Sequence, residues 1–88
     1  MMIIKKDGRL QEYDEKKIHT SIENASKDVQ GMSFNESDIR IIVKDITKKL
    51  TQIRKDDSPS STYEIRGVLV EVLIKDGFGE ILKSFIQH

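Results

Sequence analysis

The chain has 88 residues, in which 15 Lys and Arg balance 15 Asp and Glu, so its formal net charge is zero. This length suits one small domain, and the neutral balance argues against a dedicated nucleic-acid-binding module, which usually carries a basic excess. The lack of cysteine excludes disulfides and thiolate metal sites. The two histidines, His19 and His88, lie too far apart in the sequence to indicate a short-spaced zinc-binding pair.

The sequence contains no apolar run that could cross a membrane, since no such run, that at residues 41–43 included, is longer than four residues. The N-terminus lacks the basic region and apolar core of a signal peptide. We therefore expect no membrane association and a cytoplasmic location.

The chain is expected to begin with a β-hairpin over residues 2–13. Asp7-Gly8 is a strong signal for a two-residue type I′ turn, because both residues tolerate positive φ. A two-stranded hairpin is marginal alone, so we expect it to lie on helices, most simply over the first helix that follows it. The cross-strand pairs that this turn predicts are Lys6–Arg9, Ile4–Gln11 and Met2–Tyr13.

Four amphipathic helices are predicted after the hairpin, because apolar residues recur at helical spacing in four segments. Asp14 is the expected N-cap of the first helix and Gly31 its C-terminal end. Asn35 is the expected N-cap of the second, and Ser61-x-x-Glu64 predicts a capping box for the third. The predicted helices span residues 15–30, 36–54, 62–76 and 78–87.

Four such helices can bury their apolar stripes together as a small bundle. The predicted fold is mainly α with a small β-hairpin or sheet (α+β), a four-helix bundle capped by an N-terminal hairpin, in a single domain over residues 1–88. No exposed apolar stripe is expected to remain. Gly67 costs the third helix about 1 kcal/mol relative to alanine, and tight helix packing is a better explanation for it than close approach of a ligand.

No catalytic constellation is present in the sequence. Asp56 and Asp57 are adjacent in a polar loop, where solvated carboxylates are the expected interpretation. The serines at 58, 60 and 61 have no histidine nearby in the sequence to activate them, and neither a P-loop nor a dinucleotide-binding fingerprint occurs. We therefore predict no catalytic residues and no metal ligands.

Basic residues gather in and after the hairpin, but interleaved acids leave a local excess of only one charge, so a salt-bridged surface is the simplest interpretation. The positions of some residues at predicted helix starts favour a phosphate-binding site over a salt-bridged surface. Lys17 lies in the first turn of a helix, where free amides and the dipole attract anions. Thr62 and Arg66 share one face at the start of another helix. Apolar walls for a base could come from Ile4, Tyr13 and Ile18.

Residues 3–9, Ile-Ile-Lys-Lys-Asp-Gly-Arg, followed by Tyr13-Asp14 and Lys17-Ile18, resemble the opening signature of the ATP-cone. The ATP-cone is the regulatory nucleotide-binding domain at the N-terminus of many ribonucleotide reductases and in the repressor of their operons. Residues 61–66, Ser-Thr-Tyr-Glu-Ile-Arg, resemble its second signature. The resemblance covers essentially the whole chain.

The resemblance implies a helical bundle that binds ATP or dATP under the hairpin as an allosteric ligand, with Mg²⁺ at the phosphates. Lys6 stands where the family usually has Arg, which keeps the charge but loses the bidentate fork, and Gln11 stands where Glu is frequent. The implied phosphate contacts are Lys5, Lys6, Lys17, Thr62 and Arg66, with Tyr13 and Ile18 lining the base or sugar and Gln11 at the base.

The sequence thus predicts a non-catalytic regulatory domain that senses nucleotide levels for ribonucleotide reductase activity or expression. The implied partners are a reductase or another attached module, and a second copy of the chain. The departures at Lys6 and Gln11 motivate an alternative, an interaction domain that has lost nucleotide binding. A nucleic-acid-binding module ranks third because of the neutral charge. ATP or dATP preference, one or two nucleotides, and a free-standing or excised domain stay open here.

Overall fold

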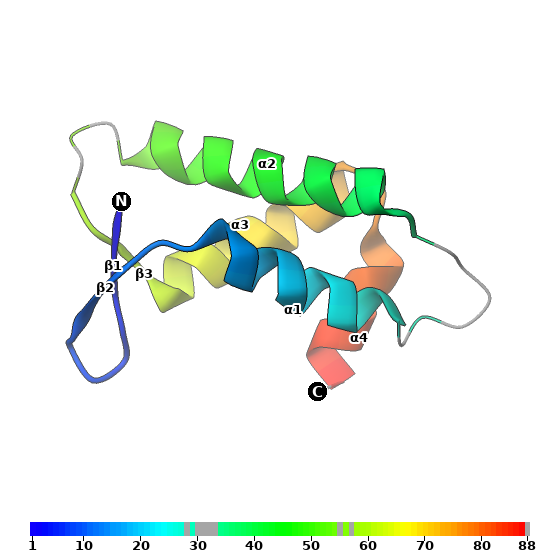
Figure 1. The fold of residues 1–88 in the computed structure, drawn as a ribbon, viewed down its shortest axis with the longest axis horizontal. Coiled ribbons are helices and arrows are strands. Elements are labelled where there is room, and N and C mark those ends of the chain that lie inside the picture. The colour runs from blue at the N-terminus through cyan, green and yellow to red at the C-terminus, as the bar shows by residue number, and fades with distance from the viewer. Residues whose placement is uncertain (28, 30–33, 55, 57, 88) are drawn as a thin grey trace.

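The computed structural model describes residues 1–27, 29, 34–54, 56 and 58–87. Within these residues the chain forms four helices and a small three-stranded sheet (Figure 1), which confirms the predicted mainly α fold. The predicted end of the first helix at Gly31 lies outside the described residues. The helices are α1 (Glu15–Lys27), α2 (Glu36–Ile53), α3 (Thr62–Lys75) and α4 (Gly79–Gln87), and the strands are β1 (Met2–Ile4), β2 (Leu10–Glu12) and β3 (Ser60–Ser61).

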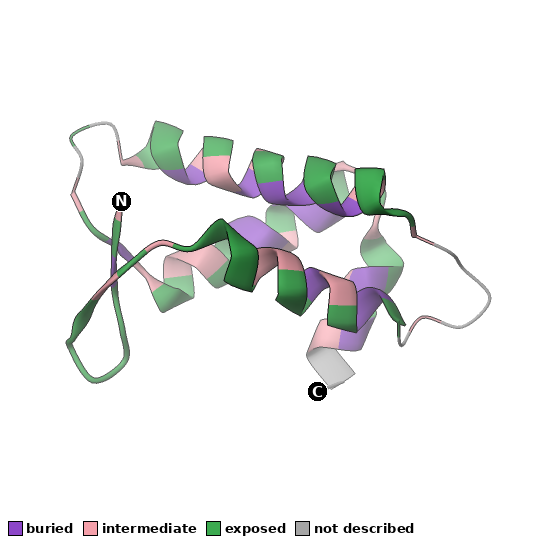
Figure 2. Cartoon of the chain, in the orientation of Figure 1, coloured by how far each residue is buried: buried purple, intermediate pink, exposed green. Residues whose placement is uncertain are grey.

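The helices pack around one hydrophobic core. α2 contacts both α1 and α3, and α4 closes the bundle against α1 and α3. The buried faces of the helices point toward one another, and the exposed faces point outward (Figure 2). Fully buried aliphatic side chains come from all four helices: Ile22, Ile42, Ile46, Leu50, Leu73 and Ile81.

The three predicted N-caps are confirmed. Asp14 accepts a hydrogen bond through Oδ1 from the backbone N–H of Lys16 (2.9 Å). Asn35 forms a reciprocal capping box with Asp38 at the start of α2. Ser61 Oγ accepts from the backbone N–H of Glu64 (3.0 Å). These caps satisfy orphan amides in the first turns, so the local sequence fixes where three helices begin.

The hairpin register differs from the prediction by one residue. Ile4 pairs with Leu10 and Ile3 pairs with Gln11, so the predicted pairs across the strands are wrong. The backbone N–H of Gly8 donates to the carbonyl of Lys5 (2.9 Å), and Gly8 has a φ of +86°. The loop therefore has three residues, with Gly8 in the left-handed region, which is another common type of hairpin connection. The predicted two-residue type I′ turn is wrong.

A third strand positions the hairpin. β3 pairs in parallel with β1, with Ile3 beside Ser60 and Ile4 beside Ser61. Because β3 leads directly into α3, the sheet caps the end of the bundle where α3 begins and does not lie along α1 (Figure 1). The expectation that the hairpin covers the first helix is therefore wrong, since a strand distant in sequence provides the anchor.

The outer face of α3 departs from two expectations. Gly67 is exposed, and a Cβ there would meet no atom within 4 Å, so the prediction of tight packing at this glycine is wrong. Tyr63 and Ile74, on the same side of the helix at i and i+11, are 71% and 62% exposed, so apolar surface does remain. No helix in the described part of the chain has the length and apolar character needed to cross a membrane.

Candidate functional site

A pocket of about 130 Å³ lies under the hairpin, between the starts of α1 and α3. It brings together six of the eight residues that the sequence assigns to ligand binding: Lys5, Gln11, Tyr13, Lys17, Ile18 and Thr62. The other residues that line it are Ile3, Glu12, Asp14 and Ile65. Lys6 and Arg66 are not among its lining residues.

The hairpin register decides which strand side chains reach this pocket. Ile3 is buried and Gln11 is half-buried, and both line the pocket, whereas Ile4 is 39% exposed. A one-residue slip moves every strand side chain to the opposite face. The apolar wall expected from Ile4 is therefore supplied by Ile3, with Ile65 of α3 as a further wall that the sequence did not single out.

Tyr13 forms a fixed wall of the pocket. Its hydroxyl lies 2.8 Å from Thr47 Oγ1 of α2, and its ring packs against the hydrophobic core. Burial raises the pKa of Tyr13 above its ordinary value, so the phenol stays neutral over the physiological range. The ring is available to a ligand as an apolar surface, while the hydroxyl is already paired.

Two further hollows adjoin the pocket. One, of about 290 Å³, lies at the hairpin turn and is lined by Lys5, Lys6, Asp7, Arg9 and Thr62, so it shares two residues with the pocket. The other, of about 430 Å³, runs along α1 and shares Lys17. Small-molecule sites usually measure roughly 300–1,000 Å³, so a ligand of nucleotide size would extend from the pocket into these hollows.

The charges around the turn fall into two classes. Arg9 is held by Asp7, with Arg9 Nε donating to Oδ2 (2.6 Å) and the backbone N–H of Arg9 donating to Oδ1 (3.1 Å). These bonds, the backbone one foremost, lower the pKa of Asp7. By contrast, no carboxylate in the described residues forms an ion pair with the four cations that the sequence assigns to an anion: Lys5, Lys6, Lys17 and Arg66.

Lys6 and Arg66 lie outside the pocket in different ways. Lys6 lines the hollow at the turn, and its Nζ lies 5.9 Å from the centre of the Tyr63 ring, within cation–π range. Arg66 is exposed one turn after Thr62 and lines none of the three hollows. The structure thus brings Lys6 close to the site and leaves Arg66 at its periphery.

Hydrogen bonds from Arg54 and Ser60 to Glu64, which we call the clamp, hold the start of α3 in place. Sequence reasoning missed them. The guanidinium of Arg54 donates to both carboxylate oxygens of Glu64, with Nε at 2.9 Å from Oε1. The fully buried Ser60 donates through Oγ to the same Oε1 (2.8 Å). The hydrogen bonds from Arg54 are the main cause that lowers the pKa of Glu64. Glu64 thus serves the clamp and not the predicted capping box, and no local sequence signal identifies its partner.

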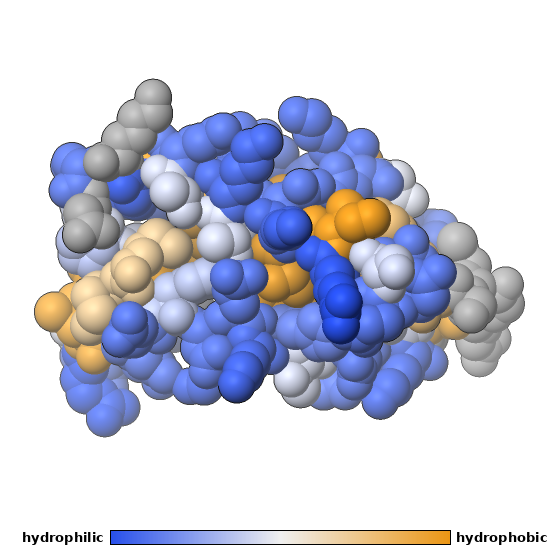
Figure 3. Space-filling model, turned by 45° about the horizontal axis from the view of Figure 1, so that its top comes forward, coloured by the Kyte–Doolittle hydropathy of each residue, from blue (hydrophilic) through white to orange (hydrophobic). Residues whose placement is uncertain are grey.

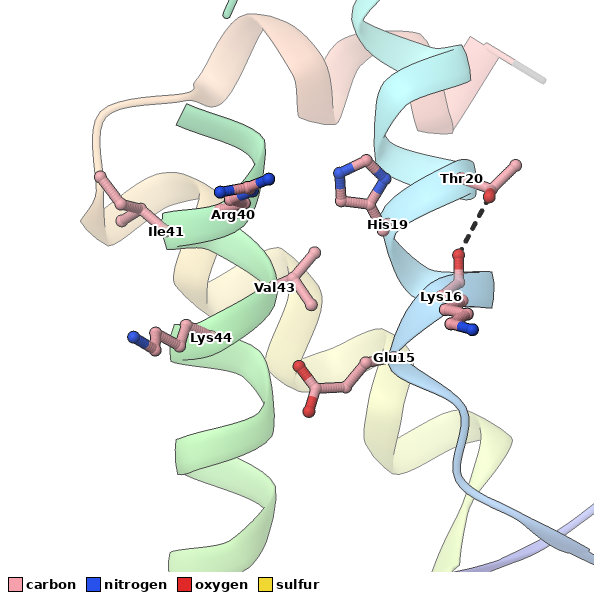
Figure 4. Close-up of a pocket in the computed structure, with 8 residues that line it drawn as sticks. All are labelled: Glu15, Lys16, His19, Thr20, Arg40, Ile41, Val43 and Lys44. Atoms are coloured by element: carbon pink, nitrogen blue, oxygen red, sulfur yellow. Dashed lines mark hydrogen bonds between the residues drawn. The ribbon is translucent and has the colours of Figure 1, made fainter. Parts of the chain in front are cut away.

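A more voluminous hollow, about 580 Å³, lies elsewhere, in a groove between α1 and α2 (Figure 4). Ile41 and Val43 contribute apolar surface there, and hydrophobic surface between hydrophilic side chains is visible on this side of the molecule (Figure 3). We assign the ligand to the hairpin pocket despite its smaller volume. It lies at the starts of two helices, where anions are favoured, and its lysines form no ion pairs with carboxylates of the described residues.

A comparison with models of protein families shows which family the chain matches. A family model described as the ATP cone domain matches residues 1–88, which is the whole chain. A comparison with curated proteins found no match. ATP-cone domains are generally nucleotide-binding allosteric regulatory domains, which bind ATP or dATP and are not themselves catalytic. The chain belongs to the ATP-cone domain family.

Proposed function

We propose that this domain binds ATP or dATP in the hairpin pocket and its two adjoining hollows, and that occupancy regulates ribonucleotide reductase activity or expression. The observation that carries the proposal is the meeting of Lys5, Lys17 and Thr62 at the starts of two helices. Basic side chains and first-turn amides together favour a polyphosphate.

In the proposed pose the base and sugar lie in the pocket. Tyr13, Ile18 and Ile65 supply its apolar walls, and the amide of Gln11 faces the same space and can both donate and accept. A glutamate at this position would only accept, so Gln11 broadens the hydrogen-bonding pattern that the site offers to a base.

The phosphates in this pose begin beside Lys5 and Lys17, which line the pocket, and extend into the hollow at the hairpin turn, where Lys6 and the start of α3 lie. Lys6 acts there as a point charge without the fork of an arginine. Mg²⁺ is part of the proposal and would be held chiefly by phosphate oxygens. Asp7, which lines the hollow at the turn, and Asp14, which lines the pocket, already accept hydrogen bonds from Arg9 and Lys16.

Regulation in this proposal acts through a ribonucleotide reductase or another module, attached or separate, or through association with a second copy of the chain. Such a nucleotide sensor would act in the cytoplasm. The competing candidate is an interaction domain that has lost its nucleotide. The pocket volume of about 130 Å³ and the departures at Lys6 and Gln11 are the observations that favour it.

Calorimetric titration with ATP and dATP tests the proposal. Each charge-assisted phosphate contact contributes roughly 1.5–3 kcal/mol, so Lys17→Ala should weaken binding by about tenfold or more while the melting temperature without nucleotide stays near that of the wild type. Lys44→Ala is the matched control, because Lys44 is also an exposed lysine but lines the groove between α1 and α2.

Two results would overturn the proposed site. One is the absence of both heat and thermal shift at millimolar nucleotide, which rejects binding altogether. The other is weaker binding in Lys44→Ala with unchanged binding in Lys17→Ala, which moves the nucleotide to the groove. Saturable binding of a partner protein whose affinity does not change when nucleotide is added would favour the interaction domain.

A further inference from the structure

A second cluster of ligand-type side chains lies outside the hairpin pocket, where α1 meets the start of α2. His19 and Glu23 lie one turn apart on α1, and Glu36 is the first residue of α2. One potential ligand atom from each of the three lies within 4.8 Å of the others. We propose that His19, Glu23 and Glu36 bind a divalent transition-metal ion of the Zn²⁺ type, which bridges α1 and α2.

The donor set selects the class of metal. One imidazole nitrogen and two carboxylate oxygens suit Zn²⁺ and its neighbours Co²⁺ and Ni²⁺, whereas Mg²⁺ and Ca²⁺ prefer oxygen ligands alone. This cluster is therefore chemically distinct from any Mg²⁺ held by nucleotide phosphates. Three protein ligands leave a fourth tetrahedral position for water, as in open zinc sites.

The three side chains already lie close to one another. His19 Nε2 lies 2.8 Å from Glu36 Oε1, and His19 Nδ1 lies 3.9 Å from Glu23 Oε2. One ion binds only one of these ring nitrogens. Ligands of a tetrahedral Zn²⁺ at 2.0–2.2 Å from the metal are separated by roughly 3.4 Å, and one potential ligand atom from each side chain lies within 4.8 Å of the others. Because the two carboxylates face different ring nitrogens, coordination of one ion requires rotation of the His19 ring or of a glutamate side chain.

The backbone positions of the three ligands are already fixed by the fold. Residues four apart on a helix project from the same face, which pairs His19 with Glu23. Glu36 is held at the helix start by the capping box that Asn35 forms with Asp38. His19 points from α1 toward α2 (Figure 4), and its side chain is 27% exposed, so an ion can enter from solvent.

Two cations compete for the carboxylates. Lys27 Nζ lies 3.7 Å from Glu23 Oε1, and Arg40 Nε lies 3.5 Å from Glu36 Oε1. Both cationic side chains are largely exposed, at 67% and 76%, and exposed ion pairs of this kind contribute little stability. A divalent ion that binds three ligands at once can therefore displace them, and without an ion the same residues form a salt-bridge cluster.

The test is a titration of the full chain with Co²⁺ and Zn²⁺ in the absence of nucleotide, followed by Co²⁺ absorption, calorimetry and thermal melting. The sequence offers a matched pair of variants, because His88 is its other histidine and it has no cysteine. We expect one ion per chain and a melting temperature that rises with Zn²⁺. His19→Ala should weaken binding by at least about tenfold, since even loss of residues that only support metal ligands costs 10–100-fold, whereas His88→Ala should leave it unchanged.

Glu36→Gln is the second variant, because glutamine has nearly the same volume as the exposed glutamate that it replaces. This substitution should also weaken metal binding by at least about tenfold. Glu80→Gln, which removes an exposed carboxylate from α4, should not. Absence of saturable binding overturns the proposal, as does equal binding by wild type, His19→Ala and Glu36→Gln. Because nucleotide is omitted, failure here leaves the proposed nucleotide site untouched.

Discussion

Asp76, at the C-terminal end of α3, makes stability depend on pH in a direction that can be measured. Its carboxyl and the carboxyl of Asp45 on α2 can share a hydrogen bond only when a proton lies between them. Its Oδ2 is buried and has no hydrogen-bond partner among the described residues. The hydrogen bond with Asp45, followed by burial and the charge of Asp45, raises the pKa of Asp76 from 3.8 to about 6.

A raised pKa in the folded state means that protonation stabilises the fold. The contribution of Asp76 is fully present below pH 3.8 and is lost as the pH rises through about 6. A shift of about two units corresponds to an upper limit of about 3 kcal/mol at 1.36 kcal/mol per unit. Partial solvent exposure screens this interaction, so we expect about 1–2 kcal/mol.

Urea unfolding of the wild type and Asp76→Asn at pH 5 and pH 8 measures this effect. The asparagine amide can donate to Asp45 at both pH values, so Asp76→Asn should be more stable than the wild type at pH 8 by about 1–2 kcal/mol, with a smaller gain at pH 5. Asp45→Asn should give a similar gain, and the double variant should not add to it, because both changes relieve one interaction. A variant less stable than the wild type at pH 8, or a gain equal at both pH values, would refute the reasoning.

Three further substitutions test the fold by thermal or urea unfolding. Gly67→Ala should raise the free energy of unfolding by up to about 1 kcal/mol, because the added Cβ meets no atom within 4 Å; a loss of stability would show hidden contacts. Tyr13→Phe should lower it by about 0.5–1.5 kcal/mol through loss of the hydrogen bond to Thr47, and an unchanged value would mean that this bond is not formed in solution. Gly8→Ala should cost about 1–2 kcal/mol, because φ is +86° there; a neutral change would contradict the three-residue turn.

The helices were predictable because their signals are local. The apolar spacing and the caps at Asp14, Asn35 and Ser61 each depend on residues within a few positions, and the structure confirms all three caps. The hairpin was also recognisable, but its turn type was not. Asp-Gly fits both a two-residue turn and a three-residue turn with Gly8 in the left-handed region, and the choice moves Ile3 into the pocket and Ile4 out of it.

Long-range contacts limited the prediction of the site. Motif residues predicted the pocket members Lys5, Lys17 and Thr62, but Arg66 lines none of the three hollows there. The pairing of β3 with β1 and the clamp between Arg54 and Glu64 join segments that a periodic pattern cannot connect. Both contacts set the start of α3 against the hairpin, so they position the site without a local sequence signature.

Backbone amide chemical shifts recorded by NMR during titration with ATP test the central claim most directly. We expect the largest changes at the hairpin turn, residues 5–9, and in the first turns of α1 and α3, residues 15–18 and 62–65. Residues 40–44, which border the groove between α1 and α2, should change little. Largest changes at residues 40–44, or no saturable changes at millimolar ATP, would contradict a nucleotide site under the hairpin.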